Sequence, residues 1–141
     1  KATFLQECWR VLKPDGVFLM ATWCHRPVMS ADRQTATPLT PDELQHLARI
    51  YKVYCLPYVI SLAEYVAIAQ DIGFHHIRTD DWSTAVAPFW QVVITTAMTP
   101  RALWGLVRSG WDTIRAALSL RLMHRGYQRG LIRYGLLCAT K

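Results

Sequence analysis

His25 is the side chain best suited to proton transfer in this sequence. It follows an uninterrupted apolar run at 17–23, the pattern of a buried β-strand covered on both faces. In open α/β sheets, ligands bind beyond the carboxyl ends of the strands. Histidine is the usual general base near neutral pH. His25 is therefore a candidate catalytic base or substrate-orienting group; the alternative is a histidine that packs or hydrogen-bonds at the end of the strand.

Four aromatic side chains could form the walls of a pocket for a ring-shaped substrate. They are Trp23, Trp82, Phe89 and Trp90, and Trp23 belongs to the same strand end as His25. Aromatic faces also attract a positively charged ligand. Packing in the hydrophobic core explains each of these rings equally well.

The cysteines and histidines show no spacing typical of a metal site. Cys8, Cys24, Cys55 and Cys138 form no C-x-x-C pair, and two of them lie in apolar, strand-like runs. We expect reduced, mostly structural thiols and no bound metal.

Positive charge is concentrated at the C-terminal end. Residues 1–99 hold eight Lys/Arg and nine Asp/Glu, whereas residues 100–141 hold eight Lys/Arg and one acid, Asp112. A basic segment of this kind can face nucleic acid, an anionic membrane or an acidic partner, or be a solvated helix face. We expect no nucleic-acid binding because no recognised motif accompanies the arginines.

The basic segment contains a predicted amphipathic helix at 100–123. Trp104 and Trp111 fall on its apolar face, and Arg108 and Arg115 fall on the polar face. This arrangement fits a helix lying at a membrane surface, with these four side chains facing the membrane. It fits equally well a helix that packs its apolar face on the domain.

Alternating helices and strands must position these residues. The apolar spacing predicts a helix at 2–12, a strand at 17–23, helices at 41–54 and 62–72, and a half-exposed strand at 76–82. Thr40 with Glu43, and Ser61 with Glu64, have the spacing of capping boxes that begin helices. Gly73 is the expected residue after the second of these helices.

The C-terminal half is expected to be mainly helical before a last strand. Pro88 is predicted to open a short helix that ends near residue 98, ahead of the helix at 100–123. Gly126 and Gly130 should break the helical pattern, and 131–139 reads as a final strand. The fold class is therefore α/β.

Several segments resemble one family when taken together. Residues 12–16 (LKPDG) are similar to the turn before strand 5 in class I methyltransferases that use S-adenosylmethionine (SAM), with Asp15 in place of a glycine. The segments 22–26 (TWCHR), 81–90 (DWSTAVAPFW) and 126–132 (GYQRGLI) resemble the γ-tocopherol methyltransferase family, which includes related plant alkaloid N-methyltransferases. The resemblance covers nearly the whole chain.

The resemblance implies a fold and an incomplete cofactor site. Residues 1–141 would be the C-terminal part of one Rossmann-like methyltransferase domain with sheet order 3-2-1-4-5-7-6. The chain would supply strands 5, 7 and 6, with a helical lid at about 83–129 inserted between strands 6 and 7. The loop that binds SAM is glycine-rich in this family, and no G-x-G-x-G occurs here. We expect the N-terminal SAM-binding half to lie upstream and this part alone to be inactive.

The resemblance also implies an activity. SAM would be the methyl donor, and a lipophilic, tocopherol-type phenol would be methylated on its ring, γ to α or δ to β. His25 would remove the phenol proton so that the ring carbon becomes nucleophilic, and Trp23, Trp82, Phe89 and Trp90 would hold the ring. The expected location is the chloroplast in a eukaryote, or the cytoplasm or membrane surface in a bacterium, without secretion. The alternatives are N-methylation of a small alkaloid amine and a non-catalytic module that binds a membrane or a partner.

Overall fold

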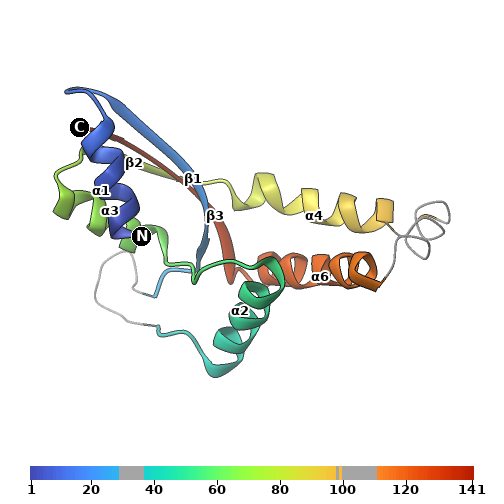
Figure 1. The fold of residues 1–141 in the computed structure, drawn as a ribbon. Helices are drawn as coiled ribbons and strands as arrows, with labels where there is room; N and C mark the ends of the chain where they lie inside the picture. The colour runs from blue at the N-terminus through green and yellow to red at the C-terminus, as the bar shows by residue number, and fades with distance from the viewer. Residues whose placement is uncertain (29–36, 98, 100–110) are drawn as a thin grey trace. The chain divides into compact units, whose positions relative to one another are not determined.

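The structure, a computed structural model, describes residues 1–28, 37–97, 99 and 111–141 (Figure 1). Within this part, the side chains of 97 and 111–119 are not described. The chain separates into two compact units. Unit 1 contains residues 1–38, 59–82 and 133–141, and unit 2 contains residues 39–58 and 83–132.

Unit 1 is built on a three-stranded sheet. Its strands are β1 (Val17–His25), β2 (His75–Asp81) and β3 (Ile132–Thr140), arranged in the order β1-β3-β2. β2 runs antiparallel to β3, with Arg78 opposite Cys138. The strand that comes last in the chain therefore lies between the other two, as the resemblance predicted.

Two helices supply the core of unit 1. α1 (Ala2–Val11) and α3 (Leu62–Ile72) contact each other and bury apolar side chains against the sheet (Figure 1). Leu5, Ala69 and Leu137, from the two helices and from β3, have no exposed surface. This packing holds the sheet in place, and with it the C-terminal end of β1 at His25.

The opposite face of β1 is not covered within unit 1. Val17 and Leu19 are 65% and 63% exposed, whereas Phe18 and Met20 pack against the core. The prediction that both faces of this strand are buried is therefore wrong for the described chain. The helices α1 and α3 cover only one side of the sheet, so only one face of β1 is buried. The apolar run alone does not show which face of the strand is covered.

The turn before β1 depends on its residue types. Asp15 adopts a left-handed conformation with φ 61°, a region that glycine enters freely and that aspartate tolerates better than most residues. A Cβ atom on Gly16 would lie 2.8 Å from the carbonyl oxygen of Lys13, so a side chain there would collide with the backbone.

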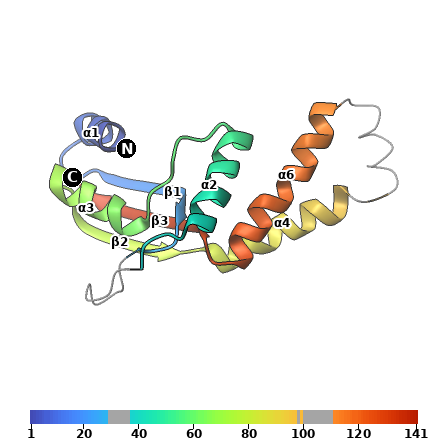
Figure 2. The same ribbon diagram turned by 90° about the horizontal axis from the view of Figure 1, so that it is seen from below.

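Unit 2 is helical. It contains α2 (Pro41–Tyr54), α4 (Ser83–Ala97) and α6 (Trp111–Gln128), and α4 and α6 lie side by side (Figures 1 and 2). Its buried apolar residues come from all three helices and from the chain that follows: Leu47, Ile50, Trp90, Met123, Tyr127, Leu131 and Ile132.

Two predictions about unit 2 are wrong. α4 begins at Ser83, with Pro88 inside it, because the lost backbone hydrogen bond lies near the helix start and Trp90 is buried beyond it. α6 continues through Gly126 to Gln128. Gly126 is buried there, and a Cβ would lie 2.7 Å from Cγ1 of Ile132, so close packing explains the glycine. Most of the first half of the predicted helix at 100–123 lies outside the described residues.

The predicted helix ends are confirmed elsewhere. Thr40 with Glu43 and Ser61 with Glu64 both form capping boxes, with each cap hydroxyl accepting from the backbone N–H of the glutamate at 3.3 Å. Gly73 ends α3 with φ 111°. Among the described residues, no helix is both long and apolar enough to cross a membrane.

Candidate functional site

His25 is the last residue of β1 and lies largely buried in unit 1. It forms a parallel bridge with Ser61, the residue that caps α3, and its exposed fraction is 8%. Its Nδ1 lies 2.7 Å from the carbonyl oxygen of Arg26. A carbonyl only accepts hydrogen bonds, so Nδ1 carries a hydrogen and donates it. In the neutral ring, Nε2 therefore holds the lone pair.

The lone pair of His25 is directed toward a carboxylate. Nε2 of His25 lies 3.6 Å from Oε2 of Glu64, whose side chain is about half exposed. The same oxygen accepts from the Ser61 hydroxyl at 2.7 Å and from the Ser61 backbone N–H at 2.8 Å. Thus the capping box of α3 also fixes the carboxylate that faces His25.

The surroundings keep Glu64 ionised. Burial alone would raise the pKa of Glu64, but the hydrogen bonds from the Ser61 hydroxyl and backbone, together with the charge of His25, outweigh burial and lower it. The ionised Glu64 carboxylate therefore lies beside Nε2 of His25, the ring nitrogen that carries no hydrogen in the neutral tautomer.

Cys24 is next to His25 but is unsuited to nucleophilic chemistry. Burial raises the pKa of its thiol to about 11, although a backbone hydrogen bond involving Gly135 acts in the opposite direction. A Cβ on Gly135 would lie 3.2 Å from Sγ of Cys24 and 2.9 Å from Cδ1 of Leu62. Cys24 therefore packs in the core of unit 1. All four cysteines are free.

Trp23 and Trp82 both belong to unit 1. Trp23 is half-buried in β1. Trp82 follows β2 and is 46% exposed, with its indole Nε1 donating to Asp80 at 2.7 Å. Next to it, Asp81 is engaged by Arg133 at 2.7 Å, so that carboxylate is a structural ion pair.

Phe89 and Trp90 belong to unit 2 and differ in their surroundings. Trp90 is 6% exposed, lies edge-on to Tyr54 and stacks on Tyr127. Phe89 is 58% exposed on the surface of α4. Trp90 is thus part of the core of unit 2, and Phe89 has the free surface that a ligand could contact.

The residues predicted to face a membrane lie outside what the structure describes. Trp104 and Arg108 are not described at all, and for Trp111 and Arg115 in α6 only the backbone is described. No group of three potential metal ligands occurs among the described residues.

Sequence reasoning identified Ser61 and Glu64 only as a helix cap and missed their contact with His25. The contact depends on a bridge between residues 36 positions apart, which no local pattern reveals.

Comparison with known proteins shows which proteins the chain is similar to. The chain is 43% identical over its whole length to a probable tocopherol O-methyltransferase of Oryza sativa, and 39% identical to tocopherol O-methyltransferase of Arabidopsis thaliana. The chain is a relative of the tocopherol methyltransferases. It spans 38% and 39% of the lengths of these two proteins and matches their C-terminal part. Norajmaline N-methyltransferase of Rauvolfia serpentina is 26% identical and is covered to 47%. No protein-family model matches.

Solved structures confirm the fold of this tocopherol methyltransferase relative. A phosphoethanolamine N-methyltransferase of Haemonchus contortus superimposes with a TM-score of 0.74 at 11% identity, over all of this chain and 30% of its own. A cyclopropane synthase of Mycobacterium tuberculosis gives 0.73 at 17% identity, over 99% of this chain and 49% of its own. The fold is thus the C-terminal part of a class I methyltransferase, with β1, β3 and β2 as strands 5, 7 and 6.

Proposed function

We propose that the whole protein transfers a methyl group from SAM to a ring carbon of a tocopherol-type phenol, converting γ- to α- and δ- to β-tocopherol. The observation that carries methyl transfer to a tocopherol is the identity of 43% and 39%, over the entire chain, with two proteins named tocopherol O-methyltransferase. Methylation at the ring carbon instead of the oxygen is the finer part of the proposal and rests on the family resemblance. SAM would supply the electrophilic methyl group. The glycine-rich loop of the class is absent from this sequence, so the cofactor would be held by other parts of the whole protein.

The role proposed for His25 follows from its hydrogen bond to the Arg26 carbonyl and from the nearby Glu64 carboxylate. With Nδ1–H donated to the Arg26 carbonyl, Nε2 is the atom that can accept the phenol proton. The phenolate then pushes electron density onto the neighbouring ring carbon, which makes that carbon the nucleophile. Glu64, at 3.6 Å, would stabilise the imidazolium that forms. Glu64 is in this sense a positioning residue for His25.

Two aromatic side chains have the surface to hold the substrate ring. Trp82 and Phe89 are 46% and 58% exposed, and Trp23 is half-buried beside the candidate base. The buried Trp90 would act indirectly, by supporting Phe89, whose ring meets it edge-on with centroids 5.4 Å apart.

Two variants of the full-length protein test the base. His25→Asn keeps a donor for the Arg26 carbonyl and removes the proton acceptor, so turnover should fall by about 10²-fold or more, with little change in the KM for SAM. Glu64→Gln should lower turnover less and alter its pH profile. If His25→Asn turns over normally, His25 is not the base.

N-methylation of an alkaloid amine is the rival activity, and the lower identity of 26% to norajmaline N-methyltransferase makes it the weaker one. An assay with labelled SAM and either γ-tocopherol or an indole amine separates the two. Transfer to γ-tocopherol alone supports the proposal, and transfer to the amine alone contradicts it.

We also propose that the segment 100–123 contacts a membrane surface, where a substrate with a phytyl tail would dissolve. Its sequence supports this, since Trp104 and Trp111 share the apolar face and Arg108 and Arg115 the polar one. Replacing both tryptophans by serine should weaken binding of the full-length protein to liposomes. The names of the two plant relatives include "chloroplastic", which supports a chloroplast location for a plant protein.

A further inference from the structure

A basic pocket lies between two helices of unit 2. None of the residues assigned to methyl transfer lines it. It has a volume of about 480 Å³ and is lined by one face of α2 and the end of α6. α2 supplies Asp42, Gln45, His46 and Arg49, which share a helix face at the spacing i, i+3, i+4, i+7. α6 supplies Arg125 and Gln128, and Arg129 directly follows the end of this helix.

The two helices are held together at the base of this pocket. Nε2 of His46 lies 2.9 Å from the carbonyl oxygen of Leu122 and donates to it. A Cβ on Gly126 would lie 3.6 Å from the same nitrogen, an ordinary van der Waals distance, so Gly126 and His46 lie close together at this contact. Leu47 and Ile50, on the neighbouring face of α2, are buried. The backbone that carries the pocket residues is therefore fixed by packing.

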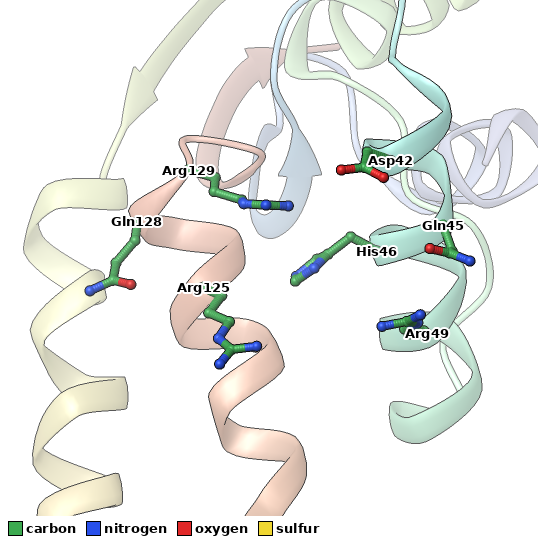
Figure 3. A pocket seen from close by; sticks show the side chains of 7 residues that line it. All are labelled: Asp42, Gln45, His46, Arg49, Arg125, Gln128 and Arg129. Carbon is green, nitrogen blue, oxygen red and sulfur yellow. The ribbon is translucent and has the colours of Figure 1, made fainter.

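The three arginines of the pocket form no ion pair with a carboxylate in the part of the chain that the structure describes. Figure 3 shows Arg129, just after α6, extending toward α2, with Arg125 on the α6 side and Arg49 on the α2 side of the pocket. Among the described residues, none of these three forms an ion pair, whereas Arg10 and Arg133 do so with Glu7 and Asp81. Because three arginines and one aspartate line the pocket, its net charge is positive.

The lining indicates the class of ligand. Among the described residues, the lining contains no phenylalanine, tyrosine, tryptophan or aliphatic side chain, so a chromanol ring would find little apolar surface there. Planar guanidinium groups that converge from two helices match the oxygens of a phosphate, which can accept two hydrogen bonds from each arginine. A phosphate dianion would also offset the repulsion among the three arginines.

We propose that the pocket between α2 and α6 binds a phosphate group, carried either by a small phosphate monoester or by a lipid headgroup. Arg49, Arg125 and Arg129 hold the phosphate oxygens. The binding is independent of the methyl-transfer residues and does not require that proposed function to be correct.

The test uses the full-length protein and two probes. Isothermal titration calorimetry with glycerol 3-phosphate measures binding of a soluble monoester. Sedimentation with phosphatidylcholine vesicles, with or without phosphatidic acid, measures binding of the same chemical group on a lipid. Each probe is applied to the wild type, to Arg125→Gln, to Arg129→Gln and to a control, Arg78→Gln, which removes an exposed arginine of β2 in unit 1.

Loss of one pocket arginine should weaken binding about tenfold or more, and the control should bind within about twofold of the wild type. Binding of glycerol 3-phosphate identifies a soluble ligand, and binding to phosphatidic acid vesicles alone identifies a headgroup; both support the proposal. If neither probe binds the wild type, the proposal is overturned. It is also overturned if Arg78→Gln weakens binding as much as the pocket variants do. A matching loss of SAM affinity in the pocket variants also overturns it, because the arginines would then serve the carboxylate of the methyl donor.

Discussion

Replacing Ser61 by alanine probes the link between the cap of α3 and the candidate base. The Ser61 hydroxyl accepts from the Glu64 backbone N–H at 3.3 Å and donates to the Glu64 carboxylate at 2.7 Å, and Ser61 is 1% exposed. Loss of an N-cap hydroxyl costs about 1 kcal/mol. A hydrogen bond to a charged group contributes about 1.5–3 kcal/mol, reduced here because the Glu64 side chain is half exposed. We therefore expect Ser61→Ala to lower the free energy of unfolding by about 2 kcal/mol.

Thr40→Ala is the matched control, because the chain contains two capping boxes of the same chemistry. Thr40 accepts from the Glu43 backbone at 3.3 Å, and its own N–H donates to the Glu43 carboxylate at 2.8 Å, but Thr40 is exposed. Loss of the Thr40 hydroxyl should lower the free energy of unfolding by only about 1 kcal/mol, the usual contribution of an N-cap. Urea unfolding of the full-length protein measures both variants.

The two capping variants should also differ in activity. In Ser61→Ala the backbone N–H of residue 61 still donates to Glu64, so the carboxylate is held less firmly but remains near His25. Turnover should fall several-fold in this variant and stay unchanged in Thr40→Ala. Equal losses of stability, with turnover unchanged in both, would refute the reasoning that burial and the contact with His25 set the α3 cap apart.

Three further predictions concern Cys24, Gly135 and Glu64 of unit 1, with Cys55 of unit 2 as the exposed reference thiol. Cys55 is exposed and should react quickly with Ellman's reagent, whereas native Cys24, with a pKa of about 11, should react only on unfolding, since about 0.1% of it is thiolate at pH 8. Gly135→Ala should lower the free energy of unfolding by about 1–3 kcal/mol, measured in urea, because the added methyl meets the Leu62 side chain at 2.9 Å. The pKa of Glu64 is lowered from 4.5, so its ionised form stabilises the fold above about pH 4.5, and that stabilisation is lost as the pH falls through the lower folded value. The stability gap between wild type and Glu64→Gln should therefore close in acid; a gap independent of pH would contradict the shift.

Helix ends were predictable because they depend on local chemistry. The α2 and α3 bounds follow from Thr40 and Ser61 as caps and from Gly73 in a left-handed conformation, each determined by a few neighbouring residues. The start of α4 was not predictable from Pro88, because tertiary burial of Trp90 outweighs one missing backbone hydrogen bond.

The sheet order was predictable only through the resemblance. Periodicity marks where strands occur, but nothing local places β3 between β1 and β2. The same limit applies to the candidate site. His25 was identified by its place after an apolar run, while its partner Glu64 depends on a long-range bridge. The pocket between α2 and α6 was likewise missed, because its arginines come from segments more than 70 residues apart.

The position of the transferred methyl group tests the central claim most directly. The full-length protein would be incubated with γ-tocopherol and SAM carrying a deuterated methyl group, and the product analysed by mass spectrometry and NMR. The account predicts the label on a carbon of the chromanol ring, with the phenolic hydroxyl intact. A labelled ether at the phenol oxygen, or no labelled tocopherol at all, would contradict it.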